Sequence, residues 1–511
     1  MSAAKTQLTP QALRELVRDA IPAESTEYGA PPPAHQFFMP KSHARALHLN
    51  LPVVVGSRGT GKSFWWAALQ SKEHRRLVEQ SAPDARIKEA TQVRPGFGVT
   101  SDPKHYPSRD TLAMLLERGR SAREIWRTVV VWAAAEGELV PELKLWEQRV
   151  AWVVEHPEQV EGLLHAKDLA LQAQDADLLV LFDGLDWTSN DWGRVFILVE
   201  GLLQVALEVR SYRRIRAKVF LRSDQFDDQR IARFPDASKL VASRVQLTWH
   251  TNELYGLLWK LLAFHPAKGG DFRLFVFDRI VNLTGSEKAL KDPGTWQLPS
   301  EVYFDAKVQQ RLFHELTGPY MGDNARCGFP YKWLTTHLAD AHGETTPRSF
   351  LVALRSAAEE TIERHPESGF ALAYRGLQVG VRVASRIRVD EISEHWWVPE
   401  VLRPLPAALR VPFCIDALEA RWHEDGTLDR IAAEWQQRMD SGGVVGDVDR
   451  PWLLPAHLDD GMTGVCRDLE ALGVFRRMRQ ERIDVPDIYR LGFELRRKGG
   501  IPPKSVRQGG R

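Results

Sequence analysis

The stretch LPVVVGSRGTGKSFWWAALQ, residues 51–70, decides the fold of this chain. It predicts a short buried strand, a glycine-rich loop and the first turns of a helix in direct succession. The loop has the spacing G-x-x-x-x-G-K-S and consists of Gly56, Ser57, Arg58, Gly59, Thr60, Gly61, Lys62 and Ser63. Glycines let such a loop curl so that its N–H groups point at a phosphate, at the positive end of the helix dipole. We expect Lys62 to reach the β- and γ-phosphate oxygens and the Ser63 hydroxyl to ligate Mg²⁺.

A second apolar strand is predicted at Leu178–Phe182, and it ends in acids. In a P-loop fold this strand lies beside the phosphate loop, so Asp183 at its tip is expected to hold Mg²⁺ through water. Asp186, three residues further on, lies where a carboxylate can polarise an attacking water. Strands that end in solvated acids are common, so both assignments depend on the phosphate loop.

A third strand is predicted at Lys218–Leu221, and it ends in Arg222 and Ser223. Either side chain is a candidate for contact with a γ-phosphate or the lytic water, although a plain surface strand end explains the pattern equally well. Helical patterns separate the three strands, which predicts right-handed crossovers and a parallel sheet with helices on both faces.

The same patterns divide the chain into four parts. We expect an N-terminal helix and Pro-rich spacer over 1–45, an α/β P-loop core over 46–250 and an α-helical lid over 251–369. A mainly helical, winged-helix-like region with a basic tail follows over 370–511. His35, His43 and His48 precede the first strand; one of them is a candidate for contact with a base, although solvated histidines are the commoner outcome.

Composition excludes several classes of protein. The 511 residues carry 68 Lys and Arg against 67 Asp and Glu, so any binding of a polyanion requires a local basic patch. Three widely spaced cysteines exclude a disulfide framework, and the 16 histidines show no zinc-ligand spacing. We find no signal peptide and no apolar run of membrane-spanning length, which predicts a cytoplasmic protein without membrane contact.

The three strand ends together resemble the AAA+/STAND branch of P-loop ATPases. The Asp-Gly-Leu-Asp sequence at 183–186 is similar to NACHT- and KAP-type and to initiator-type members. Thr346-Pro347-Arg348 is similar to the Pro-Arg pair that opens the sensor 2 helix of the lid, which implies that Arg348 reaches the γ-phosphate. The family also implies an arginine finger from a neighbouring subunit, for which Arg233 and Arg244 are the candidates.

One departure from the family pattern concerns hydrolysis. These families often carry a glutamate after the second acid, but Trp187 follows Asp186 here. Either Asp186 alone acts as the base, or hydrolysis is slow and the protein is a switch held by its nucleotide.

The C-terminal region contains the local basic patch. A helix is predicted over 464–472 and two short strands over 474–479 and 482–485, and residues 474–511 hold eleven basic and four acidic side chains. A helix followed by a basic two-stranded wing resembles a winged helix-turn-helix, which makes Arg476, Arg477, Arg479 and Arg482 candidates for DNA contact. Such winged helices also serve as packing modules between domains, and that alternative stays open.

The sequence thus favours an ATP-binding and ATP-hydrolysing AAA+/STAND-like switch that uses ATP and Mg²⁺. The resemblance implies assembly into a homo-oligomer or with an effector protein, and a place in bacterial antiviral defence. One alternative is a DNA-engaging loader or initiator, and another is a non-hydrolysing scaffold that binds nucleotide structurally. A metabolic kinase fits the chain length and the Pro-Arg lid poorly.

Overall fold

The computed structural model describes residues 8–497 with the exception of 24–29, 32, 136–142, 190–191, 224, 227–233, 235, 280–297, 407, 441–453 and 456. The chain forms two compact units, one of residues 25–248 and one that combines residues 1–24 with residues 249–511. No helix in these described ranges is both long and apolar enough to cross a membrane.

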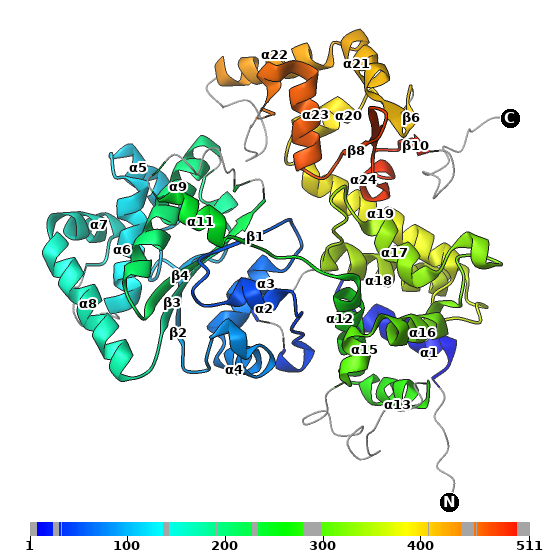
Figure 1. Ribbon diagram of the computed structural model, residues 1–511, viewed down its shortest axis with the longest axis horizontal. Helices are drawn as coiled ribbons and strands as arrows, with labels where there is room; N and C mark the ends of the chain where they lie inside the picture. The colour runs from blue at the N-terminus through cyan, green and yellow to red at the C-terminus, as the bar shows by residue number, and fades with distance from the viewer. Residues whose placement is uncertain are drawn as a thin grey trace, which may run out of the picture. The chain divides into compact units, whose positions relative to one another are not determined.

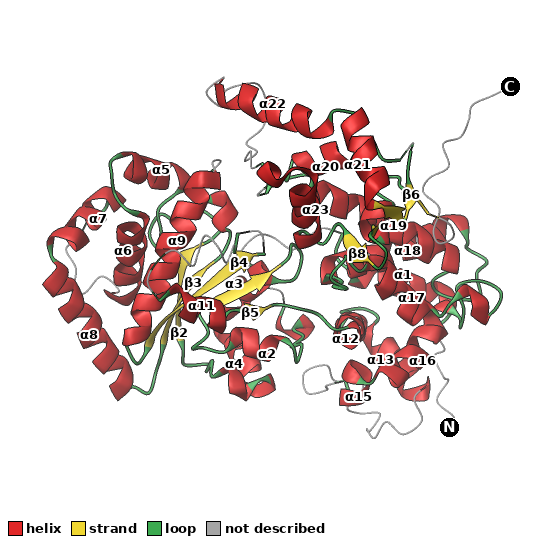
Figure 2. Ribbon diagram, turned by 45° about the horizontal axis from the view of Figure 1, so that its top comes forward, coloured by secondary structure: helices red, strands yellow, loops and turns green. Residues whose placement is uncertain are grey.

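The unit of residues 25–248 is built on a parallel five-stranded sheet with the order β2-β3-β4-β1-β5 (Figures 1 and 2). Its strands are β1 (Val53–Gly56), β2 (Gln92–Phe97), β3 (Leu178–Phe182), β4 (Ile215–Arg222) and β5 (Val245–Gln246). Its helices are α2 (His43–Leu47), α3 (Lys62–Gln70), α4 (Lys72–Ser81), α5 (Arg109–Glu117), α6 (Ala122–Ala135), α7 (Trp146–Glu155), α8 (Pro157–Ala173), α9 (Trp192–Glu208) and α11 (Ala237–Ser243).

Helices cover both faces of this sheet because its strands are apolar on both sides. Leu179 and Leu181 belong to one buried cluster with Trp65 and Trp66 of α3. The alternate residue Phe182 faces the other way, and its ring lies 5.7 Å from that of Trp126 on α6. Near-continuous apolar strands are the pattern that a parallel sheet buried on both faces requires. The predicted α/β core is therefore confirmed.

The order of the strands differs from one expectation. We placed the strand that carries Asp183 beside the phosphate-loop strand, but β4 lies between them, because Val219 pairs with both Val53 and Phe182. The sequence also gave no sign of β2. Pro95 and Gly96 interrupt its pattern, and an edge strand tolerates a proline that a central strand would exclude.

The second unit is mainly helical. Its helices are α1 (Pro10–Ala20), α12 (Thr251–Ala263), α13 (Gly269–Arg279), α15 (Ser300–Phe304), α16 (Ala306–Thr317), α17 (Pro330–Leu338), α18 (Pro347–Arg364), α19 (Tyr374–Ile392), α20 (Trp397–Leu402), α21 (Ile415–Glu424), α22 (Thr427–Asp440), α23 (Gly461–Ala471) and α24 (Asp487–Arg490). Its strands are β6 (Arg410–Val411), β7 (Phe413–Cys414), β8 (Arg476–Met478), β9 (Arg482–Asp484) and β10 (Arg496–Arg497).

The N-terminal helix α1 belongs to this helical unit, where it packs on α18. It begins as the sequence predicts, because Pro10 occupies the first turn and the Thr9 hydroxyl accepts a hydrogen bond from the Ala12 N–H at 3.2 Å. The buried Arg14 donates to three carbonyls of the segment 366–370 at 2.9–3.1 Å. Arg355 of α18 donates to the carbonyl of Arg18 at 2.7 Å. Two arginines thus join segments more than 330 residues apart in the chain.

The C-terminal part has the predicted winged-helix character. Strands β7, β9 and β8 form an antiparallel three-stranded sheet in that order, and α21, α22 and α23 lie between β7 and β8 in the chain. Strands β8 and β9 are the two short strands predicted over 474–479 and 482–485. A separate parallel pair, β6 and β10, follows the cis peptide bond region near Pro412 in space and ends the described chain.

Candidate nucleotide site

The phosphate loop joins the end of β1 to the start of α3. Gly59 and Gly61 have φ values of 75° and 102°, in the left-handed region where a side chain would be strained. The Thr60 hydroxyl donates to the Ser57 carbonyl at 2.8 Å and closes the loop on itself. An added Cβ at Gly56 would lie 2.6 Å from that hydroxyl oxygen, so the glycine is required for the close approach.

The polar groups of this loop fit an anionic ligand. The Lys62 ammonium donates to the carbonyls of Gly56 and Ser57, each at 2.8 Å, and so lies over the loop. The Ser57 hydroxyl oxygen is buried and has no hydrogen-bond partner among the described residues. Together with the first N–H groups of α3, these groups supply the donors that phosphate oxygens accept.

Asp183 follows β3 directly and is buried. Burial raises the pKa of its carboxyl, while the hydrogen bond with Ser63 and the charge of Lys62 favour the carboxylate. A hydroxyl and a carboxylate in contact fit Mg²⁺, which is commonly bound through one or two protein oxygens with phosphates and waters as the other ligands. Consistently, no cluster of three His, Cys, Asp or Glu side chains suited to a metal occurs in the described ranges.

Asp186 lies on the short 3₁₀ turn Leu185–Trp187, and it is not a free carboxylate. One of its oxygens, Oδ2, lies 3.4 Å from Arg222 Nη1 and 3.5 Å from Arg58 Nη2. The Trp187 side chain, at the position where related families often have glutamate, is 54% exposed. The arginine pairing of Asp186 has no counterpart in local sequence patterns, because it joins three separate segments.

Arg222 is brought to the loop by the strand order. It is the last residue of β4 and pairs in register with Gly56, the last residue of β1. Its side chain is buried, whereas Ser223 is exposed. The structure therefore brings together the phosphate loop, Asp183, Asp186 and Arg222, and it favours Arg222 over Ser223 at this edge.

Two buried polar side chains near the loop escaped the sequence analysis. Lys218 of β4 donates to three carbonyls of the segment 46–51, which leads into β1. Trp65 of α3 donates to His43 Nδ1 at 2.9 Å, so the neutral ring of His43 carries its proton on Nε2 and donates to the Thr248 carbonyl at 3.1 Å. Since His43 is fully buried in these contacts, it does not fit the base-contacting role considered above.

Arg348 lies in the first turn of α18, in the helical unit, and donates to Glu391 of α19 at 2.5 Å. Its contact with a γ-phosphate stays a prediction. Of the arginine-finger candidates, Arg244 lies 5.3 Å from the ring centroid of Phe226, and Arg233 falls outside the described residues.

The basic character of the wing is partly compensated within the fold. Arg476 pairs with Asp484, and Arg477 lies 2.9 Å from Glu470. Arg482 donates to the Pro412 carbonyl at 2.9 Å, while Arg479 is exposed at the tip of the β8–β9 hairpin. The basic tail from Lys498 onward falls outside the described residues.

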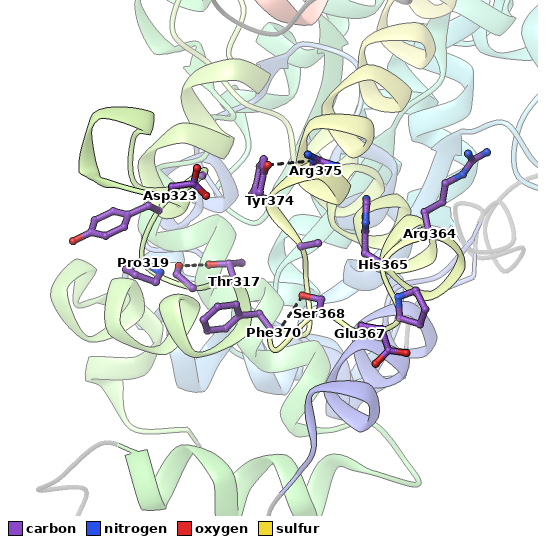
Figure 3. A pocket seen from close by; sticks show the side chains of 15 residues that line it. Thr317, Pro319, Asp323, Arg364, His365, Glu367, Ser368, Phe370, Tyr374 and Arg375 are labelled. Atoms are coloured by element: carbon purple, nitrogen blue, oxygen red, sulfur yellow. Dashed lines mark hydrogen bonds between the residues drawn. The ribbon is translucent and has the colours of Figure 1, made fainter.

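A separate cavity of 770 Å³ lies within the helical unit (Figure 3). The end of α16, the end of α18 and the start of α19 form its walls, and Phe370, Tyr374 and Arg375 line it. Tyr374 and Arg375 are hydrogen-bonded to each other at 3.2 Å, and the Leu372 N–H donates to the Leu316 carbonyl at 2.9 Å, so two of the walls are joined.

Comparison with known proteins gives little beyond this geometry. No protein-family model matches the chain, and no curated protein matches it in sequence. Among solved structures, the ORC2 protein of Aeropyrum pernix in ADPNP-ADP complexes is similar to it, with 12% sequence identity and a TM-score of 0.30. That match covers 93% of this chain and 98% of the other. The description of the site therefore depends on this chain's own residues.

Proposed function

We propose that the protein binds ATP with Mg²⁺ at the phosphate loop and hydrolyses it slowly, as an AAA+-like switch. One observation carries the proposal: Lys62, the Ser63–Asp183 pair and Asp186 converge at the carboxyl edge of one parallel sheet. This edge, beyond the strand ends, is where α/β folds of this kind bind their ligands.

The roles of the side chains follow from their positions. The loop N–H groups and Lys62 bind the phosphates, Ser63 and Asp183 hold the cation, and Arg222 lies close enough to orient the terminal phosphate. Mg²⁺, when bound, would neutralise charge that develops on the phosphates. Asp186 is the candidate to polarise water, but two arginines neutralise it, and no glutamate follows it. Slow turnover is the expected result, and it would give the nucleotide state a long lifetime.

The finer parts of the proposal rest on the resemblance of the motifs alone. They are closure of the helical lid on ATP through Arg348, assembly into a homo-oligomer or with an effector protein, and a role in bacterial defence. The non-hydrolysing scaffold differs from the switch only in turnover, so the same experiment separates the two.

The test measures Mg²⁺-dependent ATP binding and turnover in the wild type and in Lys62→Ala. The matched control is Lys72→Ala, since Lys72 is an exposed lysine of α4, 3.6 Å from Glu89. We expect Lys62→Ala to abolish both binding and turnover and Lys72→Ala to change neither. Binding without turnover in the wild type would favour the scaffold, and undetectable ATP binding by the wild type would refute the proposal.

The exposed arginines of the β8–β9 hairpin favour DNA engagement as a second candidate function. If the wing grips a duplex, replacing Arg479 and Arg482 with alanine should weaken DNA binding and reduce its dependence on salt by about one unit of slope per lost phosphate contact. The control is Arg403→Ala, because Arg403 is an exposed arginine paired with Glu400 at 2.7 Å. Equal affinities for all these proteins would leave the wing as a packing module.

A further inference from the structure

Asp186 is the only point at which three segments of the candidate site meet through charge in the printed contacts of the described residues. Arg58 comes from the phosphate loop, Arg222 from the end of β4, and both guanidinium groups approach the same carboxylate oxygen. The Arg222 side chain is 9% exposed, Asp186 22% and Arg58 28%, so the cluster lies at the rim of the site, in partial contact with solvent.

The geometry of these pairs is that of exchangeable contacts. The separations of 3.4 and 3.5 Å are longer than those of an optimal charge-assisted hydrogen bond, and neither pair is bidentate. Partly exposed ion pairs of this kind are individually weak. A ligand that offers several anionic oxygens at the same place competes effectively with one carboxylate oxygen.

Both arginines flank the loop that we assign to the phosphates. Arg58 is a loop residue, and Arg222 ends the strand that pairs with Gly56. Lys62 adds a third positive charge. Without Asp186, the rim would hold uncompensated cations whenever the site lacks an anion.

We propose that Asp186 is a counter-ion that holds Arg58 and Arg222 in the nucleotide-free protein, and that both arginines exchange it for the terminal phosphate of ATP. This inference rests on the proposed function, since it requires phosphate at the loop. It gives the site a means to distinguish ATP from ADP, because the exchange needs the third phosphate. It also leaves the Asp186 carboxylate free to act on water only after ATP has bound.

The exchange predicts a specific pattern of nucleotide affinities. Asp186→Asn removes the competitor for the two arginines, so ATP should bind roughly three- to ten-fold more tightly while ADP changes less than about two-fold. Arg58→Gln should weaken ATP binding, and by a larger factor in the Asp186→Asn background than in the wild type. In the wild type, part of what Arg58 gains from phosphate is offset by the contact with Asp186 that it gives up.

The experiment is a double-mutant cycle of Arg58→Gln and Asp186→Asn, with dissociation constants for ATP and ADP measured by equilibrium binding in the presence of Mg²⁺. Arg118→Gln is the control, since Arg118 pairs with Glu147 in an exposed contact between the end of α5 and α7. Thermal unfolding of each variant checks that it folds. The same cycle with Arg222→Gln replaces the first if Arg58→Gln fails to fold.

The outcomes separate the inference from the function on which it rests. Non-additive ATP affinities with nearly unchanged ADP affinities support the exchange. Additive effects would mean that Asp186 acts on phosphate only through space, and they would overturn it, as would an unchanged or weaker ATP affinity of Asp186→Asn. Failure of the wild type to bind either nucleotide would instead refute the proposed function itself.

Discussion

Lys218 allows a quantitative test of the segment that leads into the phosphate loop. It is fully buried in β4, and its ammonium donates to the carbonyls of Ala46, His48 and Leu51 at 3.0, 3.0 and 2.8 Å. Burial lowers its pKa from 10.5 to about 7. Between these two values the unfolded chain binds more protons than the folded protein, so the free energy of unfolding increases with pH. From pH 7 to pH 9 this lysine should add about 2 kcal/mol of stability, and Lys218→Met should lack that increase.

The assay must follow the unit of residues 25–248 by itself, because a chain of two units need not unfold in one step. Urea titrations at pH 7, 8 and 9, each followed by a hydrogen-exchange pulse at one fixed pH, report the unfolding of the peptides that contain β1 and β4. Lys239→Met, which replaces an exposed lysine of α11, is the control and should follow the wild type. Parallel pH dependences of wild type and Lys218→Met would refute the reasoning, since they would show that the three carbonyls keep the ammonium charged in the folded protein.

Three further substitutions test the packing of the fold. Gly380→Ala should destabilise the helical unit by about 2 kcal/mol or more, because the new Cβ would lie 2.0 Å from the Ala353 carbonyl oxygen where α19 packs on α18. Gly162→Ala should instead stabilise α8 by up to about 1 kcal/mol, because nothing lies within 4 Å of its Cβ position; denaturant unfolding measures both. Arg14→Ala should cost about 2–4 kcal/mol, since three carbonyls of the segment 366–370 lose their buried donor. Faster proteolysis within that segment would accompany the loss, and an unchanged cleavage rate would contradict it.

Much of the nucleotide site is predictable because its signals are local. The glycines at 59 and 61 mark positive φ angles, and Lys62 opens the helix that follows, all within eight residues of one another. The helix cap at Thr9 and the cap at Thr346 before Pro347 are likewise read from neighbouring residues, and both occur where the sequence predicts a helix start. Strand β2 was missed for the same reason, since Pro95 and Gly96 break the local pattern on an edge strand that tolerates them.

The sequence by itself determined the phosphate loop, the acid that follows β3 and the helical and winged-helix-like character of the second half. Only the tertiary structure decided that β4 separates the two motif strands, that Arg58 and Arg222 share one oxygen of Asp186, and that α1 packs more than 330 residues away from its place in the chain. Periodicity, capping and turn chemistry act over a few residues and are therefore legible in the sequence. Strand order and ion pairing depend on which distant segments bury their apolar faces together, and no local pattern specifies that choice.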